Sequence, residues 1–151
     1  AAHGASTAQR TRAFAELARG YLETSYGDER EAPDDLVHVT CTGYVSPSPA
    51  QRVIADRGWG AATRVTHAYQ MGCYAAVPAL RIATGAIATG SRRVDVAHTE
   101  LCSLHFDPTD HSLEQLVVQS LFADGIIRYS LVPSAARGLR VLAVAEQVLP
   151  D

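Results

Sequence analysis

The stretch Tyr69-Gln70-Met71-Gly72-Cys73-Tyr74-Ala75-Ala76 decides how the rest of the chain is interpreted. The run Arg64–Tyr69 before it predicts a strand, and the glycine predicts a turn. From Cys73 to about Thr89 the sequence is apolar nearly all round, which predicts a helix buried in the middle of the domain. Cys73 therefore stands at a predicted helix N-terminus, where free N–H groups and the helix dipole favour a thiolate. An inert buried cysteine is the alternative.

The composition predicts a single soluble domain. The chain has 151 residues, 47% of them hydrophobic, which is enough for one core. The net charge is −3, and the 13 basic residues form no basic stripe, which argues against a nucleic-acid partner. No apolar run is long enough to cross a membrane, and residues 1–4 lack the features of a signal peptide. We therefore expect a cytoplasmic protein with no membrane partner.

The cysteines predict neither a disulfide framework nor a metal site. Cys41, Cys73 and Cys102 show no CxxC spacing, and their number is odd. Both features argue against a structural zinc ion and favour a reducing compartment.

Two further signals concern the long helices. Residues 8–25 follow the spacing of an amphipathic helix, with Thr7 as the expected N-cap and Gly27 as the stop. In the helix that begins at Cys73, Pro78 predicts a local distortion because it lacks a backbone N–H. The apolar face of the first helix is expected to contain Phe14, Leu17, Ala18, Tyr21 and Leu22.

Shorter helices and strands complete the pattern. Ser48-Pro49 predicts the start of a short helix that ends at Gly58, and Ser112 with Gln115 predicts a capping box for a helix over Leu113–Phe122. The alternation of elements predicts an α/β fold with a mixed, largely parallel sheet covered on both faces. Strands are expected over Leu36–Thr42, Arg64–Tyr69, Arg93–Leu101, Ile126–Val132 and Leu139–Val148.

Four stretches together indicate a family. They are Val39–Tyr44 (VTCTGY), Gln70–Ala75 (QMGCYA), Thr99–Leu104 (TELCSL) and Val118–Gly125 (VQSLFADG). In order and spacing they resemble the bacterial type III polyketide synthases, the chalcone synthase-like enzymes of the thiolase superfamily. The resemblance runs over nearly the whole chain.

The resemblance implies a thiolase-like fold, in which two similar halves form α/β/α/β/α layers. Residues 1–151 would form a single unit that is most of the N-terminal half of a longer synthase. The family's opening strand and its whole C-terminal half would be absent. Because that strand is central to its sheet, its loss is expected to leave unpaired strand edges and a slot in the core.

The resemblance also implies the chemistry. Cys73 matches the nucleophile that takes an acyl group from coenzyme A, after which malonyl-CoA decarboxylates and extends it. CoA thioesters are the implied substrates, and no other cofactor is expected. The resemblance places the family's catalytic histidine and asparagine beyond residue 151, so the isolated chain is expected to complete no full condensation cycle. The basic CoA-binding residues are expected upstream of this chain. A homodimer is implied. The product class stays open among pyrones, resorcinols and hydroxynaphthalenes.

The same resemblance assigns pocket residues. Phe122 matches the gatekeeper between the CoA tunnel and the cavity, although a core aromatic beside a turn is the alternative. Thr42, Glu100, Cys102 and His105 match cavity-lining positions. For Cys102 a buried strand cysteine, and for His105 a solvated loop residue, are the alternatives. The remaining histidines that we expect to be structural or on the surface are His38, His67, His98 and His111.

Three other functions are considered. A β-ketoacyl-acyl carrier protein synthase III-like enzyme shares the fold, but its sequence around the cysteine usually differs. A non-catalytic assembly module would explain a chain without the downstream histidine and asparagine. A cysteine hydrolase is the weakest, because no histidine shows a recognisable pairing motif.

Overall fold

The computed structural model describes residues 4–134 and 137–149. The signal-peptide expectation rests largely on residues 1–3, which lie outside this range. The elements in chain order are α1 (Thr7–Tyr26), β1 (Asp35–Thr40), α2 (Pro49–Asp56), β2 (Arg64–Tyr69), the 3₁₀ turn η1 (Cys73–Ala75), α3 (Ala76–Ala88), β3 (Val94–Glu100), the 3₁₀ turn η2 (Cys102–His105), α4 (Leu113–Leu121) and β4 (Gly125–Leu131).

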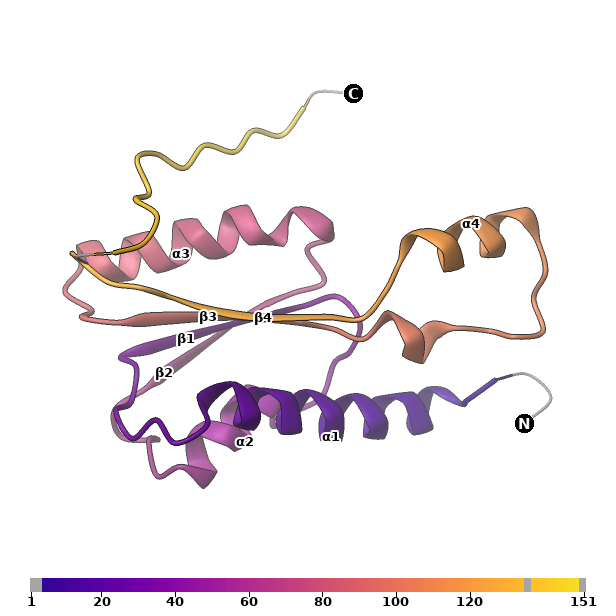
Figure 1. Cartoon of the computed structure of the whole chain (residues 1–151), viewed down its shortest axis with the longest axis horizontal. Coiled ribbons are helices and arrows are strands. Elements are labelled where there is room, and N and C mark those ends of the chain that lie inside the picture. Colours follow the sequence, from indigo (N-terminus) through magenta and orange to yellow (C-terminus); the bar gives the residue numbers. More distant parts are fainter. Residues whose placement is uncertain (1–3, 135–136, 150–151) are drawn as a thin grey trace.

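In the described part of the chain, the strands form one four-stranded sheet of order β2-β1-β3-β4 (Figure 1). Strand β1 pairs in parallel with β2 and β3, and β4 pairs antiparallel with β3. The central strands are buried nearly throughout, as expected for a sheet covered on both faces. The predicted α/β class with a mixed, largely parallel sheet is confirmed.

The expected slot in the sheet is not formed. Strand β1 pairs directly with β3 over five residues, from Asp35 opposite Val94 to Val39 opposite His98. The backbone N–H and C=O groups of the two strands thereby form hydrogen bonds with each other. An unpaired buried N–H or C=O would be costly, which favours this direct pairing. The prediction of unpaired edges at this place was wrong.

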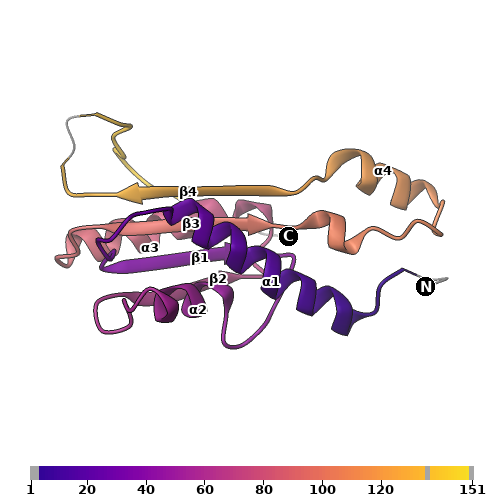
Figure 2. The ribbon, with the colours of Figure 1, turned by 60° about the horizontal axis from the view of Figure 1, so that its bottom comes forward.

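Helices cover the two faces of the sheet. Helices α1 and α2 lie on one face and α3 on the other, whereas α4 projects beyond the end of the sheet (Figures 1 and 2). On the α1–α2 face, Leu22, Tyr26 and Trp59 pack with Leu36 of β1. On the α3 face the core consists of small and β-branched side chains: Val37, Val39, Ala68, Ala75, Ala79, Ala83, Val94 and Val96.

Local signals at helix ends were mostly predicted correctly. Ser48 caps α2 in a reciprocal capping box with Gln51, and Gly27, at a φ of 51°, ends α1. The cap of α1, however, is Ser6 rather than Thr7, because Ser6 forms the capping box with Gln9.

The buried stripe of α1 is narrower than predicted. Phe14, Ala18, Leu22 and Tyr26 are buried, spaced by four residues, whereas Leu17 and Tyr21 are exposed. The chain thus uses only the central line of the apolar face.

Helix α3 shows a distortion near Pro78, as predicted, but it is less buried than predicted. Its first turn is the 3₁₀ turn η1, and the α-helix begins at Ala76. Pro78 lacks the N–H that would bond to the Tyr74 carbonyl, so a regular α-helix from Cys73 would leave that carbonyl without its partner. Moreover, α3 is buried on one side only: Pro78, Ala79 and Ala83 are buried, and Ala76 and Ala88 are exposed.

The strand predicted over Leu139–Val148 is wrong. These residues form no regular structure, and Leu139, Leu142 and Val148 are largely exposed. The segment turns away after β4 and runs outside α3 (Figure 1), where Arg81 forms an ion pair with Glu146. An apolar alternating sequence becomes a strand only where a sheet edge accepts it, and this segment does not lie along one.

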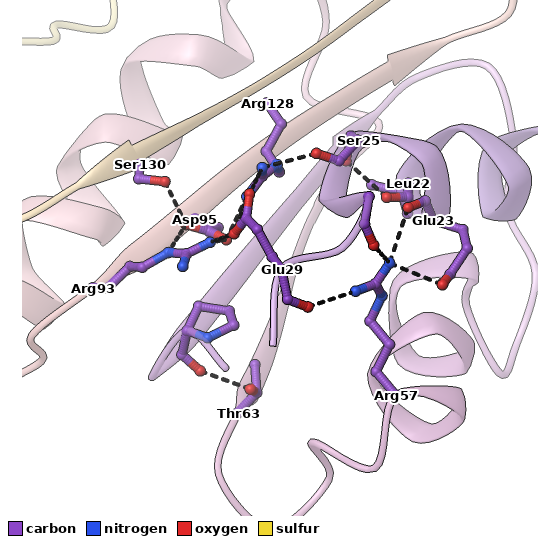
Figure 3. A network of polar contacts seen from close by, with 12 residues as sticks. Leu22, Glu23, Ser25, Glu29, Arg57, Thr63, Arg93, Asp95, Arg128 and Ser130 are labelled. Carbon is purple, nitrogen blue, oxygen red and sulfur yellow. Dashed lines mark hydrogen bonds and ion pairs between the residues drawn. The ribbon is translucent and has the colours of Figure 1, made fainter. Parts of the chain in front are cut away.

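A buried network of charged side chains connects the loop after α1 to strands β3 and β4 (Figure 3). Asp95 of β3 is fully buried, and its carboxylate accepts hydrogen bonds from Arg93, Arg128 and Ser130 over 2.7–3.1 Å. Arg93 and Arg128 also pair with Glu29, which follows α1. Each charge therefore has a partner of opposite sign, as a buried charge requires.

Arg57 secures the end of α1 from the other side. Its guanidinium donates to the carbonyls of Glu23, Gly27 and Glu29 at 2.9–3.1 Å and lies over the Tyr26 ring. These bonds tie the last turn of α1 and the loop after it to Arg57. Among residues 4–134 and 137–149, each helix is too short or too polar to cross a lipid bilayer.

Candidate active site

The carboxyl ends of three parallel strands meet at one edge of the sheet. Beyond β1 lie Cys41 and Thr42, beyond β2 lies Cys73, and β3 ends at Glu100 before Cys102. Parallel sheets place ligand sites at this edge. A cavity of about 630 Å³ opens there, and α4 contributes its outer wall.

All the predicted site residues line this one cavity. They lie at the edge described above, in η2, or directly after α4. They are Cys73, Phe122, Thr42, Glu100, Cys102 and His105.

The turn before Cys73 presents the thiol to the cavity. Gln70 has a φ of 56° and Gly72 a φ of 80°, and both values lie in the left-handed region. For Gly72 this costs little, whereas a β-carbon there would be strained. Cys73 is exposed, so the alternative of an inert buried cysteine is wrong. The Gly72 N–H donates to Cys41 Sγ at 3.2 Å, which ties this turn to the end of β1.

Glu100 holds the end of β1. Both of its carboxylate oxygens accept the Cys41 N–H at 3.0 Å, and Thr40 Oγ1 lies 3.5 Å from one of them. The chain leaves the sheet here, so this N–H has no strand partner, and the carboxylate takes that place. Glu100 thus shapes the cavity wall through the backbone of its neighbour.

Thr42 bridges the ends of β1 and β3 as well. Its hydroxyl accepts the Leu101 N–H at 2.8 Å, and its carbonyl accepts from His105 Nε2 at 2.8 Å. Since a carbonyl only accepts, Nε2 of His105 carries the proton and leaves Nδ1 as an acceptor in the neutral ring. His105 is exposed as the loop alternative supposed, but η2 directs it to the cavity.

The outer wall comes from one face of α4 and the residue after it. Gln115, Val118, Gln119 and Phe122 line the cavity at the i, i+3, i+4, i+7 spacing of a helix face. Phe122 is 51% exposed, so the core-aromatic alternative is wrong for the described chain. The capping box at Ser112 is half formed: Ser112 Oγ accepts the Gln115 N–H, while the Ser112 N–H donates to Asp110.

Burial shifts the pKa of the Cys102 thiol and that of the His98 imidazole. Burial, with the nearby charges of Glu100 and Asp124, raises the pKa of the Cys102 thiol, which favours the protonated form. Cys102 lies half-buried in η2, so the alternative of a buried strand cysteine is wrong. Burial lowers the pKa of His98, although the Glu100 carboxylate opposes this, so the imidazole is neutral near pH 7.

Sequence reasoning missed several lining residues. Cys41 directly follows β1 and lines the cavity, so the strand-end rule would have selected it. His98 shares a face of β3 with Glu100, two residues along, and its Nε2 lies 3.3 Å from the Tyr129 hydroxyl. The alternation of strand side chains was the available signal.

The other histidines are structural or on the surface, as predicted. His38 is fully buried between Thr99 and Tyr69, and burial lowers its pKa to about 3. His67 contacts the Ser48 hydroxyl at 2.8 Å, and His111 is exposed. Within the described ranges, no three histidine, cysteine or acidic side chains are grouped so that they could hold a metal ion.

Cys73 stands just before a helix with one buried side, at the carboxyl edge of a mixed sheet. This arrangement is that of a thiolase-like fold. The family of chalcone and stilbene synthases, N-terminal domain, matches residues 10–131. The chain therefore belongs to the chalcone and stilbene synthase family.

Known relatives agree with this assignment. The chain is 29% identical over 119 residues to the 1,3,6,8-tetrahydroxynaphthalene synthase of Streptomyces griseus, covering 78% of this chain and 32% of that protein. It is 29% identical over 123 residues to the 3,5-dihydroxyphenylacetyl-CoA synthase of Amycolatopsis orientalis, covering 78% and 33%. The chain thus spans about a third of the length of these relatives.

The fold agrees as well. The crystal structure of the type III polyketide synthase 1,3,6,8-tetrahydroxynaphthalene synthase from Streptomyces coelicolor superposes with a TM-score of 0.76 at 26% identity. The superposition covers 87% of this chain and 40% of that one. The predicted thiolase-like fold is confirmed, and the comparisons support the polyketide synthase interpretation rather than the carrier-protein synthase alternative.

Proposed function

We propose that this chain is the N-terminal part of a type III polyketide synthase, an acyltransferase that loads an acyl-CoA starter on Cys73. The observation that supports the proposal is the meeting of all six predicted site residues around one cavity that Cys73 faces. The relatives, which are synthases of hydroxynaphthalene and dihydroxyphenylacetyl-CoA, support the same class.

In the loading step, the Cys73 thiolate attacks the carbonyl carbon of the acyl-CoA thioester. A bond forms between Cys73 Sγ and the acyl carbon, the bond to the CoA sulfur breaks, and CoA leaves as a thiolate that takes up a proton. Malonyl-CoA then loses CO₂, and its carbanion attacks the acyl carbon on Cys73. The bond between that carbon and Cys73 Sγ breaks, the Cys73 thiolate leaves, and the extended β-ketoacyl chain remains on the CoA that carried the malonyl group. The position of Cys73 at the first turn before α3 supports its role, because helix N–H groups favour a nearby anion.

The other site residues act on the bound acyl chain rather than on its carbonyl. Phe122, half-exposed at the end of α4, is proposed as the gate that an acyl chain passes. Thr42, Cys102 and His105 are proposed to line the space for the growing chain. Glu100 is proposed to set the shape of that space through Cys41. CoA thioesters are the proposed substrates, with no other cofactor, and the active form is proposed to be a homodimer.

Intact-mass spectrometry tests the loading step. The purified protein is incubated with a panel of acyl-CoA starters, and the acyl adduct is compared with that of Cys73→Ala. We expect a single adduct that is lost in this variant. Cys102→Ala is the matched control: it removes a thiol of the same cavity, and its adduct is expected to persist because the raised pKa of Cys102 keeps that thiol protonated.

Two results would argue against the proposal. An adduct of equal amount in Cys73→Ala would assign the acyl group to another thiol. Folded wild-type protein that takes no acyl group from any starter would favour the non-catalytic module.

A further inference from the structure

Two hydrogen bonds between Asp124 and Ser103, together called the clasp, connect two segments that line the cavity. The Asp124 carboxylate accepts the Ser103 N–H at 2.8 Å with one oxygen and the Ser103 hydroxyl at 2.7 Å with the other. Asp124 lies two residues after Phe122, and Ser103 directly follows Cys102. The clasp therefore joins the two sides of the cavity that end in Phe122 and in Cys102.

Near its start, the segment between these residues is also held by the hydrogen bond from His105 to the Thr42 carbonyl and by Leu104, which packs against the Phe14 cluster. Residues 103–124 leave the end of the sheet and return to it, with α4 in between (Figure 1). No residue of α4 in the described chain is buried, so core packing does not fix the helix. The Asp124 carboxylate accepts two hydrogen bonds from Ser103, one with each oxygen, and this bidentate contact has a defined geometry. It joins the first and last residues of the segment 103–124.

Resting on the proposed function, we propose that Asp124 is a positioning residue that fixes the distance between the Phe122 and Cys102 sides of the cavity. In this way Asp124 determines the width of the acyl chain's path to Cys73. Asp124 itself is not a lining residue. It acts through Phe122 and Ala123, which precede it in the chain and line the wall.

A graded series of variants follows from the two bonds. Ser103→Ala removes the hydroxyl bond and keeps the bond to the N–H, whereas Asp124→Ala removes both. If the clasp positions the wall, each step should widen the range of groups that reach the cavity. Asp56→Ala is the matched control, since Asp56 pairs with Arg19 on the exposed surface formed by α1 and α2.

The first readout does not depend on the enzyme's activity. Cys73 is alkylated with a small reagent, iodoacetamide, and with a bulky reagent, a fluorescein maleimide, and the two rates are followed by peptide mass spectrometry. The ratio of the bulky to the small rate is expected to rise roughly threefold to tenfold in Asp124→Ala, with a smaller rise in Ser103→Ala. Asp56→Ala should leave the ratio at the wild-type value.

The second readout is the acyl-chain preference of loading. The rates of adduct formation with acetyl-CoA and with dodecanoyl-CoA are compared, and their ratio is expected to shift in the same order of variants. An unchanged alkylation ratio in folded Asp124→Ala would overturn the proposal. If that variant does not fold, Ser103→Ala decides: a raised ratio supports the clasp and an unchanged one refutes it. Wild-type protein that is alkylated but never acylated would refute the proposed function. The alkylation ratios alone would then decide whether Asp124 positions the cavity wall.

Discussion

Gly43 is expected to be intolerant of any side chain because Phe14 occupies the space beside it. A β-carbon on Gly43 would lie 2.2–2.4 Å from three ring carbons of Phe14. Carbon atoms pack at about 3.5–4.0 Å, so the ring would have to retreat by more than ~1 Å. Phe14 is fully buried, and it packs against Ala18 and Leu101. Gly43→Ala should therefore destabilise the protein by about 1–3 kcal/mol.

A double-mutant cycle measures whether this contact is the cause. Phe14→Ala alone should cost about 3–5 kcal/mol, because it leaves a cavity in the cluster. In the double variant the new methyl group has room, so its cost should be smaller than the sum of the two single costs by ~1–3 kcal/mol. Denaturant-unfolding midpoints of the four proteins provide the free energies of unfolding.

The control and the refutation use the same assay. Gly20→Ala adds the same methyl group within α1, where no atom beyond the neighbouring residues and the helix's own backbone lies within 4 Å of the new β-carbon. This change should stabilise the protein by about 0.5–1 kcal/mol. Costs that add within ~0.5 kcal/mol in the cycle would show that the Phe14 ring does not exclude a side chain at Gly43.

Two further predictions concern the charge network. Asp95→Asn keeps the shape of the side chain but removes the charge shared by Arg93 and Arg128, so the free energy of unfolding should fall by about 3 kcal/mol; an unchanged denaturant midpoint would contradict this. Burial raises the pKa of Asp95, but the hydrogen bonds from Arg93 and Ser130 outweigh it and hold the pKa below its ordinary value. The unfolded state then binds more protons, so stability should be lost as the pH falls below about 4; equal midpoints at about pH 6 and pH 3 would refute it.

Much of the fold could be predicted because its signals are local. The cap at Ser48 and the stop at Gly27 depend on residues within one helical turn, and both were predicted correctly. The strand ends also followed from the sequence, to within one or two residues. Because parallel strands end at one edge, the motifs after β1, β2 and β3 had to meet there, and the six predicted site residues do line one cavity.

The errors concern contacts between distant parts of the chain. The alternation in Leu139–Val148 is a β pattern, but whether a sheet edge receives it depends on where the turn after β4 leads. The direct pairing of β1 with β3 likewise depends on which strands are available, which no single segment encodes. His98 was missed because it was predicted to be structural, although it shares a face of β3 with Glu100, two residues along.

All three sulfhydryl groups of the chain lie in one place, since Cys41, Cys73 and Cys102 are free thiols and line the same cavity. A thiol-reactive label therefore reacts only at this cavity, and no cysteine has to be introduced or removed first. The stoichiometry of thiol titration, with and without a candidate ligand, reads the occupancy of the cavity directly. A library of weak electrophiles screened against the native protein would return fragments that fit this cavity, and their sizes would outline its interior.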